Sequence, residues 1–216
     1  MLAAVHEGAG SARAGVILSS RSPQRRAILE QLGVDFRVEA PEVEELTAGD
    51  PRSLVRANAV RKARDVAARS ERVAGGGRAE DVARAEARAE LVLGADTAVV
   101  LDGRAFGKPR DRAEAETFLR RLSGRTHEVM SGIAVREPGG AERSDVAVTK
   151  VRFRRLEAPD LDWYLASGEW SDRAGAYAIQ GRGAALVEEI EGDYWNVVGL
   201  PVAALLRLVP GLLRGR

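Results

Sequence analysis

The chain has 216 residues, enough for one domain with a substantial hydrophobic core or for two small lobes. Its 33 lysines and arginines nearly balance 32 aspartates and glutamates and only 5% of residues are aromatic, which argues against a nucleic-acid-binding surface or an anionic-membrane partner. Without cysteine there is no disulfide framework or thiolate site, and without a long apolar run we expect a soluble, cytoplasmic protein.

Hydrophobic periodicity predicts strands and helices that alternate along the chain. In order, we expect a strand at 16–18, a helix at 24–32, a strand at 34–38, a helix from 50 to about 68, a strand beginning at 91–93, a hairpin strand at 98–101, a helix at 112–122, strands at 128–135 and 147–153, a helix at 159–167 and a closing helix at 201–208. Residues 1–15 have the composition of a disordered tail, and 70–90 that of an Ala/Arg/Glu-rich insertion in a single domain, 16–216. Tight turns join several strands, so the sheet should be mixed.

The first candidate site is the polar segment that follows the first strand. Ser22 and Pro23 suit the cap and first turn of a helix, and Arg25 and Arg26 follow at once. Backbone N–H groups, the helix dipole and guanidinium groups would converge there on one anion. The alternative is an ordinary capped helix with two surface arginines.

The second candidate is Asp96, which we expect at the end of an apolar strand, where a rigid element would hold its carboxylate for a metal or a water. The alternative is a turn-forming aspartate. Glu42, Glu44 and Glu45 supply further oxygen ligands of the kind that suit Mg²⁺ or Mn²⁺, although most such clusters are simply solvated.

Two lysines and one histidine complete the polar candidates outside the last third. Lys108 lies between Gly107 and Pro109 in a stiff loop, and Lys62 lies on the long predicted helix. Each is a candidate phosphate contact, and each could equally be a solvent-facing lysine. His127 lacks metal-ligand spacing, so we expect it to be structural.

The glycine-rich segment 173–181 is a candidate base-recognition loop. Its small residues would let the backbone approach a flat ligand, and the Gln180 amide can both donate and accept hydrogen bonds at a base edge. The alternative is a Gly-rich turn with a half-buried glutamine.

Taken in order, these segments resemble the Maf family of nucleoside triphosphate pyrophosphatases over about 16–208, outside the tail and the insertion. The matching motifs are Ser20-Arg21-Ser22-Pro23-Gln24-Arg25, Ala95-Asp96-Thr97, Gly107-Lys108-Pro109, Leu122-Ser123-Gly124, His127-Glu128-Val129, Gly192-Asp193-Tyr194 and Val198-Gly199-Leu200-Pro201. Each motif alone is weak, whereas the ordered set is highly specific. The resemblance implies an α/β fold with an elongated mixed sheet, flanking helices and two lobes around a central cleft, and frequently a homodimer.

The resemblance also implies a role for each candidate. Asp96 would accept the proton of the attacking water, and Glu45 and Asp96 would hold a divalent cation, Mg²⁺ or Mn²⁺. Lys108, the third catalytic candidate, would bind the triphosphate. The implied substrate-binding residues are Ser20, Gln24, Arg25, Lys62, Thr97, Arg173 and Gln180. This division suits phosphoryl transfer, which needs positioning and charge neutralisation more than covalent catalysis.

Two positions depart from the family pattern. Gln24 stands where an arginine is usual, at a position associated with substrate choice, so the base preference stays open. Arg173 stands where a lysine is common, which keeps the positive charge but replaces a compact ammonium group with a planar, bidentate guanidinium group.

The motif from Ala174 to Gly181 resembles the branch that acts on dTTP and UTP, not the branch that acts on 7-methyl-GTP. The expected activity is therefore hydrolysis of dTTP, UTP and modified nucleotides to the monophosphate and pyrophosphate, with house-cleaning as the implied role. The alternative is a non-catalytic, nucleotide-binding regulator of cell division.

Overall fold

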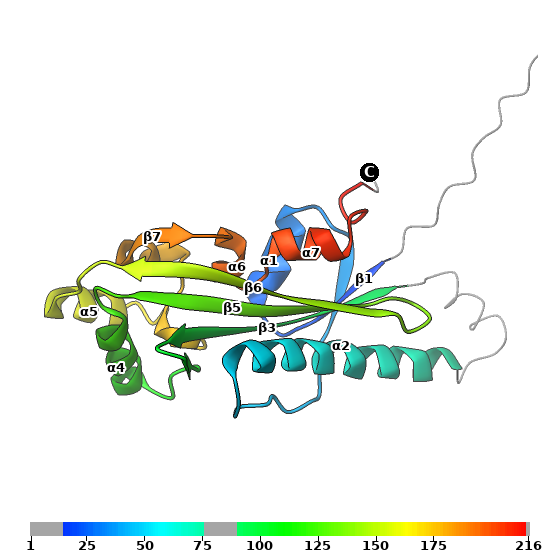
Figure 1. Ribbon diagram of the computed structural model, residues 1–216, viewed down its shortest axis with the longest axis horizontal. Coiled ribbons are helices and arrows are strands. Elements are labelled where there is room, and N and C mark those ends of the chain that lie inside the picture. The colour runs from blue at the N-terminus through cyan, green and yellow to red at the C-terminus, as the bar shows by residue number, and fades with distance from the viewer. Residues whose placement is uncertain (1–14, 76–89, 215–216) are drawn as a thin grey trace, which may run out of the picture.

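The computed structural model describes residues 15–75 and 90–214, which form a mixed α/β fold around a seven-stranded sheet (Figure 1). The predicted tail, apart from Gly15, and most of the predicted insertion lie outside the described residues. No helix in the described ranges is long and apolar enough to cross a membrane.

The elements follow the predicted alternation. The strands are β1 (Val16–Ser19), β2 (Phe36–Glu39), β3 (Leu91–Leu101), β4 (Arg104–Phe106), β5 (Thr126–Arg136), β6 (Glu142–Phe153) and β7 (Val187–Glu191). The helices are α1 (Pro23–Gln31), α2 (Pro51–Gly75), α4 (Arg112–Leu122), α5 (Ala158–Leu165), α6 (Tyr194–Val198) and α7 (Val202–Leu208), with 3₁₀ turns η1 (Ala174–Ala176) and η2 (Gly181–Leu186). The strand order is β2-β1-β3-β5-β6-β7, with β4 on β3; β1 is parallel to both neighbours and the other pairs are antiparallel. The mixed sheet with flanking helices is therefore confirmed.

Local sequence signals set the ends of α1. The Ser22 side chain accepts a hydrogen bond from the Arg25 N–H, Pro23 occupies the first turn, and Gly33 takes a φ of 64° just past the end. Helix α2 runs to Gly75, beyond the predicted end near 68, because alanine and arginine continue to favour helix where the apolar periodicity stops. The first residues of the predicted insertion therefore belong to α2.

The prediction that Asp96 ends a strand is wrong. Strand β3 runs without a break from Leu91 to Leu101, because β5 pairs with it antiparallel from Val92 to Val100. Asp96 consequently lies in the middle of β3, opposite Gly132 on β5.

The neighbours of β3 on its other edge leave a gap beside Asp96. Strand β1 pairs with β3 only as far as Gly94, and β4 begins to pair at Val99. The edge of β3 at 95–98 is thus paired by neither strand, at the carboxyl end of β1. That is the end of a parallel pair where ligands bind in open α/β sheets.

Two glycines bring α2 very close to the sheet. A Cβ added at Gly94 would lie 2.2 Å from the carbonyl oxygen of Ala59, and one added at Gly132 would lie 2.1 Å from that of Val55. Gly94 precedes Asp96 by two residues, so both lie on the same face of β3, and Gly132 lies directly across from Asp96. Figure 1 shows α2 running along β3 and β5.

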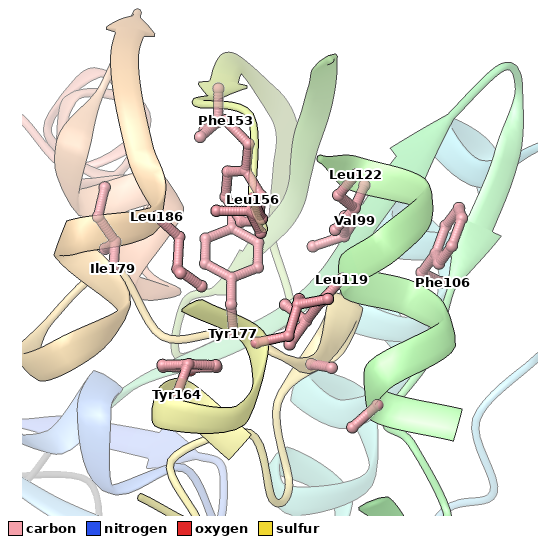
Figure 2. Packing of buried hydrophobic residues seen from close by; sticks show 14 of the residues in the cluster. Val99, Phe106, Leu119, Leu122, Phe153, Leu156, Tyr164, Tyr177, Ile179 and Leu186 are labelled. Atoms are coloured by element: carbon pink, nitrogen blue, oxygen red, sulfur yellow. The ribbon is translucent and has the colours of Figure 1, made fainter. Parts of the chain in front are cut away.

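The buried apolar residues are divided between the two ends of this elongated sheet. At one end, α4, α5 and the 3₁₀ turns pack on Phe153, Tyr164 and Tyr177 (Figure 2). At the other end α1 and α7 pack on one side, against Leu18 among others, and α2 packs on the other side, against Ile17. The segment of β3 that carries Asp96 connects the two ends.

Replacing either packing glycine by alanine should destabilise the fold. Because the added methyl group in Gly94→Ala or Gly132→Ala meets backbone atoms that no side-chain rotation can move, we expect each to lower the free energy of unfolding by about 3 kcal/mol. Urea denaturation measures this. Gly211→Ala is the control, since no atom lies within 4 Å of its added Cβ; equal effects at all three sites would contradict the packing argument.

Candidate functional site

The Asp96 carboxylate is held from two sides by α2. The Lys62 ammonium lies 2.7 Å from Oδ1, and the Asn58 amide nitrogen donates a hydrogen bond of 3.0 Å to Oδ2. These two residues are one helical turn apart, so they share a face. The Asp96 side chain keeps 14% of its surface exposed, so it remains reachable by solvent.

Glu45 joins this cluster through the same lysine. The Glu45 Oε1 lies 2.5 Å from the Lys62 Nζ, so two carboxylates, those of Glu45 and Asp96, pair with the lysine. The Lys62 side chain is only 7% exposed, and a buried charge needs such partners. Burial acts to raise the pKa of the Glu45 carboxyl, but the hydrogen bond and charge of Lys62, with the charges of Arg25 and Lys108, outweigh it and hold the pKa below its usual value. Three predicted phosphate-binding cations thus lie within electrostatic range of Glu45.

Arg25 fills the gap at the edge of β3. Its guanidinium donates to the carbonyl oxygens of Ala95 and Gly199, both at 2.8 Å, and to the hydroxyls of Ser20 and Thr97, both at 3.1 Å. The four bonds leave one N–H for a ligand. Burial lowers the pKa of Arg25, and the negative charges of Asp96 and Glu45 oppose that shift. Arg25 therefore joins α1 to β3 in addition to supplying positive charge.

The remaining predicted residues of the opening loop and β3 belong to this network. The Ser20 hydroxyl accepts the Ser22 N–H at 3.1 Å, and the Gln24 Oε1 accepts the Ser22 hydroxyl at 3.1 Å. The Thr97 and Ser131 hydroxyls are 2.8 Å apart. The structure therefore gathers Ser20, Gln24 and Thr97 around Arg25, beside the Asp96 cluster.

The other loops approach less closely. Lys108 is largely exposed, 3.6 Å from Asp172, and the Gly107 carbonyl accepts the Gly175 N–H at 3.1 Å, which joins the lysine loop to the glycine-rich segment. Arg173 is half-buried, and its Nε lacks a hydrogen-bond partner within the described residues. Gln180 is exposed, and no hydrogen bond in the described ranges joins it to Asp96.

No group of three or more acidic or histidine side chains that could hold a metal ion is found among residues 15–75 and 90–214. Glu45 and Asp96 provide two carboxylates that share Lys62. Two carboxylates suit Mg²⁺ when phosphate oxygens and waters supply its other ligands.

A family model described as Maf-like protein matches residues 15–212. The chain belongs to the Maf family. The resemblance drawn from the ordered motifs is therefore confirmed over nearly the whole of the described chain.

Two similar proteins span almost the same length as this member of the Maf family. The dTTP/UTP pyrophosphatase of Symbiobacterium thermophilum is 45% identical, over 90% of this chain and 92% of the relative. The dTTP/UTP pyrophosphatase of Thermus thermophilus is 42% identical, over 93% and 96%. Among solved structures, a HAM1 protein from Coxiella burnetii is 18% identical with a TM-score of 0.43, over 81% of this chain and 91% of that one, a likeness too low to carry an argument.

Sequence reasoning missed Asn58 in this Maf site. It is 4% exposed in the first half of α2. Asparagine is a poor helix-former, so one placed four residues before a candidate lysine in a predicted helix was the available signal. Its partners, Leu46 and Asp96, could not be read from the local sequence.

His127 is buried at the other end of the Maf fold, as a structural residue should be. Its Nε2 lies 2.9 Å from the Tyr177 hydroxyl, and its ring makes edge contacts with Phe153 and Tyr177. Burial lowers the pKa of His127 to about 4. Because Tyr177 belongs to the glycine-rich segment, His127 anchors that segment to β5.

The neutral state of His127 should make stability depend on pH. Its folded pKa of about 4 is below the ordinary value of 6.5, so protonation favours the unfolded chain and stability falls as the pH drops from 6.5 towards 4. We expect His127→Phe, although less stable at pH 7, to lose about 2 kcal/mol less than wild type between pH 7 and 4.5. Urea denaturation at each pH measures this, and parallel curves would contradict it.

Proposed function

We propose that this chain hydrolyses nucleoside triphosphates to the monophosphate and pyrophosphate, with dTTP and UTP as its main substrates. The observation that carries the proposal is the Asp96 carboxylate, fixed by Lys62 and Asn58 beside Glu45, where β3 extends past the end of β1. The relatives named dTTP/UTP pyrophosphatase support the substrate class. They do not favour the alternative, a non-catalytic regulator of cell division.

In the proposed reaction a water oxygen attacks the α-phosphorus of the nucleotide. Asp96 accepts the water's proton, a new oxygen–phosphorus bond forms, and the bond between the α-phosphorus and the bridging oxygen breaks as pyrophosphate leaves. Lys62, Lys108 and Arg25 neutralise the charge of the triphosphate, and Arg25 contributes its one remaining N–H.

Glu45 and Asp96 would hold a divalent cation, Mg²⁺ or Mn²⁺, together with phosphate oxygens and waters. When bound, such a cation neutralises phosphate charge and orients the phosphates. Glu45, whose pKa lies below its usual value, is ionised at neutral pH as an ordinary glutamate is, and so can serve as a ligand.

For the nucleoside end of the substrate, we assign Thr97 and Gln180 to the base or sugar and Gln24 to the same end. The Thr97 and Gln24 side chains lie in the Arg25 network, and Gly175 packs against Val99 on β3 with a φ of 68°. Arg173 is assigned to the phosphates for its positive charge, because its unpartnered Nε is itself buried and not open to a ligand. A homodimer and a cytoplasmic location stay predictions.

Incubation of the pure protein with dTTP or UTP and Mg²⁺ or Mn²⁺ should yield the monophosphate and pyrophosphate, resolved by anion-exchange chromatography. Asp96→Asn should lower kcat by roughly 10²-fold or more, because it removes the proton acceptor, while nucleotide binding measured by calorimetry is retained.

Asp102→Asn is the matched control, since Asp102 is an exposed aspartate paired with Arg125 at the β3–β4 turn. It should leave turnover unchanged. Release of orthophosphate alone would reject the assigned bond, and full turnover by Asp96→Asn would reject the assigned base.

A further inference from the structure

The structure assigns to Asn58 the role of a positioning residue that fixes the Asp96 carboxylate and the Glu45 loop relative to each other; this rests on the proposed function. Its side-chain amide makes three hydrogen bonds. Oδ1 accepts the Leu46 N–H at 2.8 Å, while Nδ2 donates to the Leu46 carbonyl oxygen at 3.1 Å and to Asp96 Oδ2 at 3.0 Å.

These partners determine which way the amide points. The Leu46 N–H can only donate, so it must face Oδ1, and both the Leu46 carbonyl and the Asp96 carboxylate can only accept, so they must face Nδ2. A flipped amide would lose all three bonds. Asn58 therefore has one satisfied orientation.

The backbone beneath Asn58 is equally constrained. The α2 backbone packs against the sheet on either side of Asn58, at Ala59 over Gly94 and at Val55 over Gly132. With only 4% of its surface exposed, the side chain has little room to change rotamer. Its hold on Asp96 is thus set by the packing of α2.

The chemistry of the two donors to Asp96 differs. Lys62 brings a full charge to Oδ1, whereas Asn58 fixes Oδ2 with a neutral N–H. A neutral donor orients the second carboxylate oxygen without placing a second cation beside the proton acceptor. The two bonds to Leu46 place the same amide next to Glu45, so one side chain aligns the base and the neighbouring acid.

The hydrogen bond can be tested without turnover. In ¹⁵N-labelled protein, the Asn58 side-chain amide protons should exchange slowly with solvent, and the proton that faces Asp96 should shift upfield in Asp96→Ala. Assignment by loss of the signal in Asn58→Asp makes the readout specific. A fast-exchanging Asn58 amide whose shift ignores Asp96→Ala would overturn the assignment.

Kinetics test the role. Asn58→Leu keeps the approximate volume and removes all three bonds, and Asn58→Asp keeps the acceptor for Leu46 but places a second carboxylate against Asp96. For both we expect kcat for dTTP to fall by about tenfold or more per folded enzyme, with KM within about threefold of wild type.

Asn196 supplies the matched controls Asn196→Leu and Asn196→Asp. It is also a fully buried asparagine, and its Nδ2 donates to the Val129 carbonyl oxygen at 2.9 Å and to the Thr149 hydroxyl at 3.0 Å, in contacts separate from the Asp96 cluster. These variants should lower the melting temperature and leave kcat per folded enzyme unchanged.

The outcomes separate the two proposals. A wild-type enzyme that turns over dTTP while the Asn58 variants keep its kcat overturns the role of Asn58 alone. A wild type that turns over no nucleoside triphosphate overturns the proposed function, and the positioning role falls with it. Equal loss of kcat in the Asn58 and Asn196 variants shows a structural effect and also overturns the positioning role.

Discussion

The close approach of α2 to β3 and β5 is the constraint on which the site depends. Gly94 and Gly132 leave no room for a side chain between helix and sheet, and the intervening Asp96 therefore meets the helix at short range. A helix held farther away by larger residues could not bring a lysine and an asparagine to the two carboxylate oxygens. Packing density, more than any single polar contact, fixes the distances in the Asp96 cluster.

A second constraint is the mismatch in strand length. Four-residue β1 stops at Gly94 of its eleven-residue partner β3, and the unpaired edge beyond it requires a hydrogen-bond donor from elsewhere. Arg25 supplies that donor to Ala95 and joins Gly199 to the same point. The same guanidinium thus completes the sheet and adds positive charge beside Asp96 and Glu45, which explains why a charged group is tolerated at a buried position.

Local signals were sufficient for much of the fold and for the choice of acidic and basic residues. The Ser22-Pro23 start and Gly33 stop of α1 follow from capping rules, and Asp96 stood out within its motif. The interior position of Asp96 was not predictable, because it results from pairing with β5, whose register depends on long-range packing. For the same reason the four protein acceptors of Arg25 and the contacts of Asn58 could not be predicted, since most partners of these side chains lie far away in the chain.

The most direct test of the account is a crystal structure with Mn²⁺ and a dTTP analogue whose α–β bridge cannot be hydrolysed. The account predicts the α-phosphorus beside Asp96, the metal on Glu45 and Asp96, and the phosphates within contact of Lys62 and Lys108. A nucleotide bound on another surface, with Arg25, Asp96 and Lys108 facing no common ligand, would contradict it.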